Sequence, residues 1–380
     1  MRVVIAIDSF KGSLSTVEAG NAVANGVKRV FPEAETAIFP VADGGEGTTD
    51  AIVSAVGGTF AEITVHNPLM QKIKAKYGII PQTKTAVIEM ASAAGITLID
   101  DKDKNPLHTT TFGVGEMILD AIDHGCRHFV LGIGGSATND GGVGMLQALG
   151  FSFLNAEGKS VEYGAKGLEN LQSIETNHVP EILKTCTFQV ACDVTNPLCG
   201  KSGCSAVYGP QKGATAEMIE KMDRWLKNYA SLTKTVLPEA DENAPGAGAA
   251  GGMGFALSAY LNGKMQPGIQ VVTEQIRIEE KIKSADFVIT GEGRLDGQSV
   301  MGKVPVGIAK LAKKYQKPVL AFAGCVTEDA PLCNEHGIDA FFPILKAPCS
   351  LEAAMDKENA KQNLADTACQ VFRVIRNVHI

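Results

Sequence analysis

The residues best suited to chemistry lie close together in the stretch 290–303, which reads TGEGRLDGQSVMGK. Glycines in such a stretch let backbone N–H groups approach a phosphate closely. Carboxylates can hold Mg²⁺, and cationic side chains can neutralise the charge of a transferred phosphoryl group. The charged residues here are Glu292, Asp296, Arg294 and Lys303. Their combination indicates phosphoryl chemistry, although a glycine-rich turn of mixed charge is also common as a solvated loop.

The flanking residues predict where this stretch lies in the fold. The apolar run 287–289 predicts a short buried strand, and apolar residues at helical spacing predict a helix over 304–315. Residues 290–303 would then form a strand-to-helix loop, which is where open α/β sheets bind their ligands.

The same stretch contains a partial match to the P-loop pattern. Residues 297–303 satisfy G-x-x-x-x-G-K, but the next residue is Val304. A P-loop needs a Ser or Thr at that position to bind Mg²⁺, and it begins directly after its strand. We therefore exclude a P-loop.

Two N-terminal strands are expected to end in loops of similar chemistry. The apolar run 2–7 leads into DSFKGS, and residues 36–41 lead into ADGGEGT. A carboxylate at a strand end is a frequent metal or substrate ligand in α/β folds, with helix capping as the structural alternative. The candidates are Asp8, Lys11, Asp43 and Glu46. The spacing of Ser15 and Glu18 is that of a capping box, which predicts a helix after the first loop.

The loop 132–142, GIGGSATNDGG, follows a predicted strand at 129–131. Its first residues fit the dinucleotide pattern G-x-G-x-x-[GA], but an acid at the end of the next strand is missing, since Glu157 comes only after a turn. The loop otherwise offers hydroxyls, an amide and a carboxylate beside backbone amides, which suits a phosphate or a small polyhydroxy acid: Ser136, Thr138, Asn139 and Asp140. A further strand at 188–191 leads to Asp193.

Composition narrows the classes of protein. The 380 residues carry a net charge of −7, which disfavours nucleic acid or an anionic membrane as the main partner. The nine cysteines include no CxxC pair and predict reduced thiols. The N-terminus reads as a strand rather than a signal peptide, and no apolar run approaches the ~18 residues of a membrane span. A cytoplasmic, soluble protein without a membrane partner is expected.

A change of periodicity predicts a domain boundary. Residues 62–66 and 73–79 alternate between polar and apolar with a period of two. This alternation is typical of a half-exposed hairpin, unlike the buried strands before it. We place the boundary near residue 70.

Six motifs follow one another along the chain: DSFKGS (8–13), ADGGEGT (42–48), GIGGSATNDGG (132–142), CDVTNPL (192–198), YGPQKGA (208–214) and TGEGRLDGQSVMGK (290–303). Together they resemble the bacterial glycerate kinase family, the class without a P-loop, over essentially the whole chain. The resemblance implies transfer of the γ-phosphoryl group of ATP to D-glycerate with Mg²⁺. The chief product would be 2-phosphoglycerate, with 3-phosphoglycerate as the alternative.

The resemblance also implies an α/β fold of two domains. One is discontinuous and comprises residues 1–70 and 280–380, and the other is an inserted flavodoxin-like domain of residues 71–279. The ligands would lie in the cleft between them. The boundary at 70 comes from the change of period, whereas the return near 280 rests on the resemblance.

The resemblance also implies a division of roles among these residues. Asp193 would orient or deprotonate the glycerate hydroxyl, with Asp8, Lys11 and Arg294 as further catalytic residues. Nucleotide contacts are expected from Gly134, Gly135, Ser136, Asn139, Gly291, Glu292, Gly293 and Lys303. The expected Mg²⁺ ligands are Asp43, Glu46 and Asp296.

Two other classes of function remain as alternatives. An NAD(P)-dependent hydroxyacid oxidoreductase would need a fuller nucleotide fingerprint and usually a catalytic His or Lys partner. A non-catalytic binding protein would not need acidic loops at so many strand ends. The sequence leaves open the position of the new phosphate, the nucleotide preference, the extent of domain closure and whether the protein forms a homo-oligomer.

Overall fold

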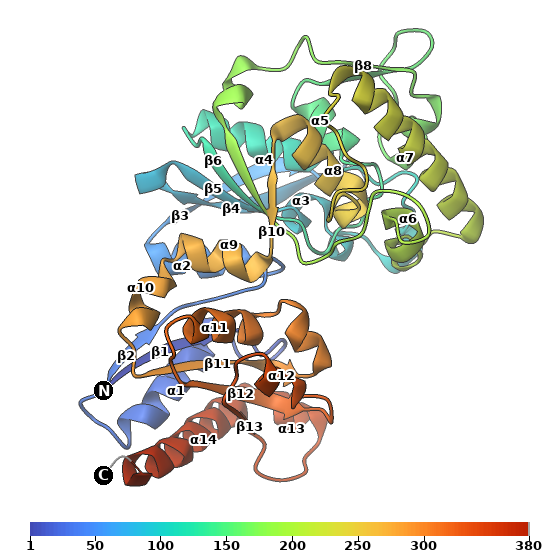
Figure 1. Ribbon diagram of the computed structural model, residues 1–380. Coiled ribbons are helices and arrows are strands. Elements are labelled where there is room, and N and C mark those ends of the chain that lie inside the picture. Colours follow the sequence, from blue (N-terminus) through green and yellow to red (C-terminus); the bar gives the residue numbers. More distant parts are fainter. Residues whose placement is uncertain (379–380) are drawn as a thin grey trace. The chain divides into compact units, whose positions relative to one another are not determined.

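The computed structural model describes residues 1–378, and Figure 1 shows the path of the chain. The chain divides into two compact units. The terminal unit comprises Met1–Asp43, Ser54–Val56 and the described residues from Gly268 onward, and the central unit comprises Gly44–Val53 and Gly57–Pro267. The helix α2 (Thr48–Val56) is divided between the two units.

The terminal unit is built on a sheet of five parallel strands in the order β13-β12-β11-β1-β2. Its inner strands are apolar because both faces are covered, with α1 and α14 on one face and α11 on the other (Figure 1). The strands are β1 (Arg2–Ile7), β2 (Glu35–Ile38), β11 (Phe287–Leu295), β12 (Val319–Val326) and β13 (Ala340–Pro343). The helices are α1 (Thr16–Lys28), α9 (Gly268–Gln275), α10 (Ile278–Lys283), α11 (Val304–Lys313), α12 (Leu332–Glu335), α13 (Leu351–Met355) and α14 (Lys357–Val378).

The strand order of this sheet identifies the place where a ligand is expected. Numbered within the unit, the order is 2-1-3-4-5, which is typical of flavodoxin-like sheets, and its switch point lies between β1 and β11. We expected a flavodoxin-like sheet in the inserted segment 71–279, but this strand order occurs in the terminal unit instead. The capping box of Ser15 and Glu18 is confirmed and starts α1 directly after the loop that follows β1.

The strand β11 is longer than the sequence predicts. It continues through Leu295, so the motif GEGRL is part of the sheet rather than the start of a loop. The register pairs Glu292 with Ala323 and Arg294 with Cys325 of β12. Glycine makes this pairing possible, because a Cβ on Gly291 would lie 2.0 Å from the carbonyl oxygen of Phe322. The loop proper begins only after Leu295, with the single 3₁₀ turn Gly297–Met301.

The central unit contains a mixed six-stranded sheet in the order β10-β9-β6-β5-β4-β3. Four of its strands are parallel, whereas β3 and β4 form an antiparallel hairpin. The strands are β3 (Thr59–His66), β4 (Lys72–Ile80), β5 (Thr85–Glu89), β6 (His128–Gly132), β9 (Thr187–Ala191) and β10 (Lys264–Gln266), with a separate pair β7 (Ser152–Leu154) and β8 (Ser173–Glu175). The helices are α3 (Ala91–Ala94), α4 (Phe112–Asp123), α5 (Val143–Ala148), α6 (Cys204–Tyr208), α7 (Ala216–Val236) and α8 (Ala249–Leu261).

The hairpin predicted from the period-two alternation is confirmed, but its position changes the boundary. The strands β3 and β4 pair from Thr59 and Ile79 to His66 and Lys72. A boundary at residue 70 would separate these paired strands. The chain instead passes from the terminal unit to the central unit between residues 43 and 57. The return crossing lies at Pro267, because α9 belongs to the terminal unit rather than to the inserted segment.

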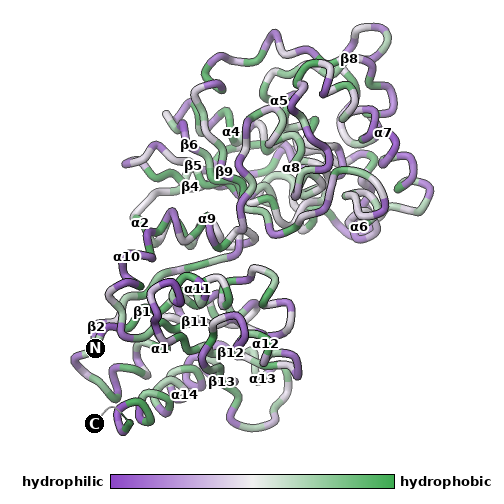
Figure 2. The backbone as a smooth tube through the Cα atoms, viewed as in Figure 1, coloured by the Kyte–Doolittle hydropathy of each residue, from purple (hydrophilic) through white to green (hydrophobic). Residues whose placement is uncertain are grey.

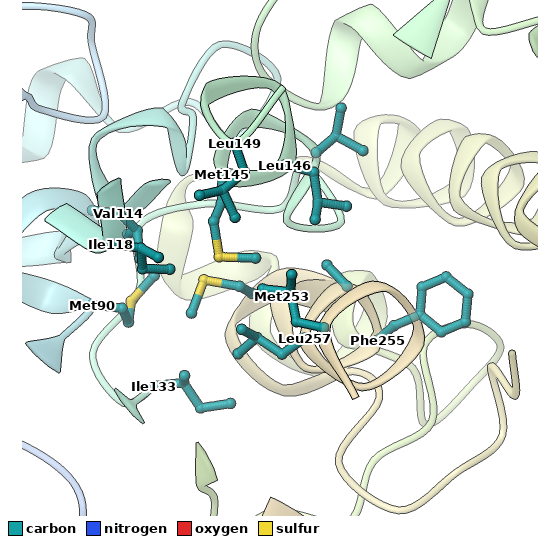
Figure 3. Close-up of a cluster of buried hydrophobic side chains, with 14 of the residues drawn as sticks. Met90, Val114, Ile118, Ile133, Met145, Leu146, Leu149, Met253, Phe255 and Leu257 are labelled. Atoms are coloured by element: carbon teal, nitrogen blue, oxygen red, sulfur yellow. The ribbon is translucent and has the colours of Figure 1, made fainter. Parts of the chain in front are cut away.

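A dense hydrophobic cluster supports the loops of the central unit (Figure 3). Figure 3 shows Met145 of α5 beside Met253 of α8, with Val114 of α4 and Ile133 at the same cluster. All four side chains are at most 4% exposed. Since Ile133 begins the loop after β6 and Met253 follows a glycine-rich bend, the core holds both segments in place.

The long helices α7 and α14 show hydrophilic and hydrophobic stretches in alternation (Figure 2), as expected for helices with one buried face. Between residues 1 and 378, no helix has both the length and the apolar character needed to cross a membrane.

Candidate active site

The first group of candidate residues lies at the switch point of the terminal sheet. The backbone N–H of Asp8 donates to the carbonyl oxygen of Gly291 at 2.9 Å, which joins the loop after β1 to β11. A Cβ on Gly293 would lie 3.4 Å from Cα of Phe10, so the backbones of the two motifs run close together. The structure therefore brings DSFKGS and GEGRL to one end of the sheet.

Two carboxylates in this group have strongly perturbed proton affinities. Burial raises the pKa of Asp8 to about 6, and the charge of Asp43 raises it further. Burial likewise raises the pKa of Glu292 to about 7, against the hydrogen bond that Ser299 Oγ donates to it at 2.5 Å and the charge of Lys303. Perturbed acids at a sheet's ligand-binding edge are typical of functional sites.

The remaining charged residues of the motif surround Asp296. Its carboxylate lies 3.5 Å from Arg294 Nε and 3.4 Å from Lys303 Nζ, and it caps the turn Gly297–Met301 by accepting from the N–H of Gln298 at 3.0 Å. Arg294 and Asp296 also line an open cavity of about 640 Å³ together with Gln298, Val326, Thr327, Glu328 and Asp329. Asp296 thus has a structural role in the turn in addition to its charge at the cavity. Lys11 is exposed in the loop after β1.

The expected Mg²⁺ ligands are distributed over both units. Asp43 and Asp296 belong to the terminal unit, whereas Glu46 is exposed in the central unit. Across residues 1–378 no group of three or more His, Cys, Asp or Glu side chains lies close enough to hold a metal ion by itself. Two of the neighbouring acids, Asp8 and Asp43, nevertheless interact through their charges.

The second group of candidates lies in the central unit, in the loop after β6. Gly134 and Gly135 are exposed, and the adjoining Ser136 is buried with 8% of its surface exposed. Asn139 is fully buried, and its amide donates to Ser205 Oγ of α6 at 2.8 Å. The structure therefore favours Gly134, Gly135 and Ser136 as ligand contacts over Asn139.

Asp140 holds the end of this loop together. Its buried carboxylate accepts hydrogen bonds from the N–H and the hydroxyl of Thr111 at 2.8 and 2.9 Å, and from the N–H groups of Gly142 and Gly144. Burial raises its pKa, although these donors act in the opposite direction. Because its acceptor sites are occupied, Asp140 is a structural residue.

Asp193 occupies the neighbouring strand end. The register pairs Gly132 of β6 with Ala191 of β9, so both loops leave the sheet at the same level. The carboxylate of Asp193 is exposed, and its loop is fixed by the N–H of Gly248, which donates to the carbonyl oxygen of Asn196 at 2.9 Å. Asp193 is therefore accessible to a substrate on the side of the sheet where Gly134 and Gly135 lie.

The structure adds two charged residues to which the sequence gave no role. Lys212 is 2% exposed, and its ammonium donates to Ser136 Oγ at 2.7 Å and to the carbonyl oxygen of Thr138 at 2.6 Å. Glu89 ends β5 and accepts from the N–H of Thr49 at 2.8 Å, and burial raises its pKa. The motif YGPQKGA contained the signal for Lys212, but the burial of a lysine depends on distant residues.

A glycine-rich bend at the start of α8 packs against the loop after β6, and this contact leads to a testable prediction. Gly251 has φ +66°, and a Cβ there would lie 2.0 Å from the carbonyl oxygen of Thr138. Gly251→Ala is expected to lower the free energy of unfolding by about 2–4 kcal/mol, because the loop must shift and the backbone is strained. Calorimetry of the unliganded protein measures this loss.

Gly200→Ala provides the matched control for that variant. Gly200 also has a positive φ, +92°, but a Cβ there would meet nothing within 4 Å. It should therefore show only the cost of the left-handed backbone, about 1–2 kcal/mol. Equal losses in the two variants would contradict the steric argument.

Comparison with known proteins agrees with these observations. The sequence model of the glycerate kinase family matches residues 3–376. The chain is 46% identical to a glycerate kinase of Haemophilus influenzae over 99% of both chains, and 47% identical to a glycerate 2-kinase of Escherichia coli K12 over 99% of this chain and 97% of that protein.

A solved structure supports the same assignment at the level of the fold. A crystal structure from Salmonella typhimurium LT2, provisionally described as a glycerate kinase 2, superposes with a TM-score of 0.92 and 44% identity. The match covers 100% of this chain and 99% of that one. The chain belongs to the glycerate kinase family and is an enzyme of the phosphotransferase class.

Proposed function

We propose that the protein transfers the γ-phosphoryl group of ATP to D-glycerate and forms 2-phospho-D-glycerate. The observation that carries this proposal is the pair of acids with raised pKa, half-buried Asp8 and buried Glu292, at the switch point of a parallel sheet, with Lys303 beside Glu292, in a member of this family. Phosphoryl transfer depends chiefly on positioning and on charge neutralisation, which such a group of opposite charges can supply.

Two carboxylates are proposed for the proton of the glycerate hydroxyl. Asp193 is exposed at the end of β9 and accessible to a substrate. Asp8 is the second candidate, because a pKa of about 6 leaves it ionised near neutral pH while it remains a stronger base than an ordinary carboxylate. Lys11 and Arg294 are proposed to bind the phosphates or the glycerate carboxylate, for which the fork of an arginine is well suited.

The chemistry of the acidic residues fits a hard divalent cation. Besides burial, the charge of Asp43 raises the pKa of Asp8, and the charges of Asp8 and Asp296 raise the pKa of Glu292, so a cation would offset repulsion in this group. We propose Asp43 and Asp296 of the terminal unit as residues that would hold Mg²⁺, while Glu46, in the central unit, stays a prediction from the sequence. When bound, the ion would neutralise charge on the β- and γ-phosphate oxygens of ATP.

A cytoplasmic location is proposed on the basis of the thiols. All nine cysteines are free, which is typical of a reducing compartment. The proposed partners are D-glycerate and ATP.

Phosphorus NMR of the purified protein with Mg-ATP and D-glycerate tests the reaction directly. We expect ADP and a new phosphomonoester, whose phosphorus–proton coupling is that of a phosphate on the secondary oxygen 2. If the phosphate were on the primary oxygen 3, the phosphorus signal would be split by the two protons on carbon 3. That result would overturn the position of the phosphate but not the kinase activity. No turnover, with oxidation of NAD(P)H on hydroxypyruvate instead, would overturn the kinase and restore the dinucleotide interpretation of residues 132–137.

A further inference from the structure

The buried ammonium of Lys212 has no counter-charge in direct contact. Lys212 ends the turn Pro210–Lys212 between α6 and α7, and its two hydrogen bonds go to neutral oxygens of Ser136 and Thr138. Within the described part of the chain, no carboxylate oxygen lies within 4.0 Å of its Nζ atom. Lysines are almost never this buried without a charged partner, because removing an unpaired charge from water is costly.

The geometry also fixes the role of the Ser136 hydroxyl. An ammonium group can only donate hydrogen bonds, so Ser136 Oγ accepts from Lys212 and keeps its own hydrogen for another acceptor. No acceptor for that hydrogen is found among residues 1–378. Ser136 is 8% exposed and directly follows the exposed Gly134 and Gly135. Its hydroxyl is therefore a hydrogen-bond donor that is polarised by the ammonium of Lys212 and lies beside two exposed glycines.

We propose that Ser136 and Lys212 form a charge-assisted subsite for an anionic substrate oxygen at the Gly134–Gly135 loop. Ser136 would contact the anion, and Lys212 would be a positioning residue that acts through it. The inference rests on the proposed function, in which both substrates supply such oxygens: the carboxylate of glycerate and the phosphates of ATP. The incoming negative charge would provide the counter-charge that Lys212 lacks.

The proton affinity of Lys212 gives the subsite a pH dependence. Burial lowers the pKa of Lys212 to about 8, while the charges of Cys204 and Asp140 act in the opposite direction. These are the titratable groups that act on it; Asp140 is engaged by the donors of Thr111, Gly142 and Gly144, and Cys204 by Ser205. Below pH 8 the ammonium polarises Ser136, and above pH 8 the neutral amine does so weakly.

The experiment measures KM and kcat for each substrate separately, in the full-length protein, on both sides of pH 8. Ser136→Ala is expected to raise the KM of one substrate about 10- to 100-fold, with a smaller effect on kcat, because one charge-assisted hydrogen bond is lost. A rise for D-glycerate would identify a carboxylate, and a rise for ATP would identify a phosphate. In the wild type that KM should increase with pH above 8, and the increase should vanish in Ser136→Ala.

A second variant and a control separate this role from a structural one. Lys212→Met should raise the same KM, and the double variant should be no worse than the more impaired single variant, because the two residues act as one unit. Lys221→Met is the control, since Lys221 is half-exposed on α7 and pairs with Glu217. If Lys212→Met does not fold, the pH profile of Ser136→Ala still tests the proposal.

The outcomes distinguish this inference from the proposed function. Wild-type turnover with unchanged KM values in Ser136→Ala would overturn the subsite and leave the kinase intact. If the wild type does not turn over, calorimetric titration with ADP and with 2-phosphoglycerate compares wild type and Ser136→Ala. Weaker binding of either anion by the variant would support the subsite, and equal binding of both would overturn it.

Discussion

Glu292→Gln is expected to stabilise the unliganded protein while it impairs catalysis. The pKa of Glu292 is about 7 in the folded chain, against 4.5 as its ordinary value. The folded state therefore binds the proton more tightly than the unfolded state, and stability falls as the pH rises from 4.5 through 7. At pH 8 the glutamine variant removes this penalty, which corresponds to at most about 3 kcal/mol.

The sign of the effect can be checked by calorimetry at several pH values. The advantage of Glu292→Gln should be largest above pH 7 and should shrink as the pH is lowered toward 4.5. The exposed Glu335 provides the control, because Glu335→Gln removes a carboxylate of the same unit that is not buried. An advantage that does not depend on pH would mean that the carboxylate is not the source of the instability.

Activity should change in the opposite direction in the same variant. Glutamine keeps the volume and can still accept the hydrogen bond from Ser299, but it carries no charge beside Lys303. We expect kcat/KM to fall by about 10²-fold, comparable with the loss of one preorganised electrostatic contact. Wild-type activity in Glu292→Gln would remove this residue from the site.

Asp193→Asn is expected to lower kcat by roughly 10² or more, if Asp193 orients or deprotonates the glycerate hydroxyl. Because the residue is exposed at the end of β9, the variant should still fold. Steady-state kinetics with D-glycerate and ATP measures the effect. Asp123→Asn, at an exposed position on α4 of the same unit, is the control that should keep full activity.

Asp8→Asn separates the two candidates for the base. If Asp8 is the base, the wild-type pH profile of kcat/KM has an acidic limb near pH 6, which Asp8→Asn removes together with most of kcat. If Asp193 is the base, Asp193→Asn loses most of kcat and Asp8→Asn retains it. Near-normal turnover of Asp193→Asn would exclude Asp193 from the mechanism.

Local patterns in the sequence predicted the structural features that are determined by residues close together in the chain. The capping box of Ser15 and Glu18 starts α1, and the alternation around residue 70 gives the hairpin of β3 and β4. Both features follow from side chains a few positions apart. The six motifs likewise indicated the family, because each is a continuous stretch of sequence and their order can be recognised without a structure.

The features that the sequence did not predict depend on distant partners. The extension of β11 through Gly291 and Gly293 requires close approach to Phe322 and Gly324 of β12, and glycine alone usually indicates a loop. The burial of Lys212 depends on Ser136, which is 76 positions away. The boundary predicted near residue 70 falls inside the hairpin of β3 and β4. The hairpin belongs to the central unit because β4 also pairs with β5.

The continuation of β11 through Leu295 has a consequence for tolerance to insertions and deletions. Successive residues of a strand face opposite sides of the sheet, so Glu292 and Arg294 share one side while Gly291 and Gly293 share the other. Inserting or deleting one residue inside this segment would exchange the two sides of the strand. Charged side chains would then face Phe10, and glycines would take the positions of Glu292 and Arg294. Length variation among natural and engineered variants should therefore begin after Leu295, in the loop that leads to α11.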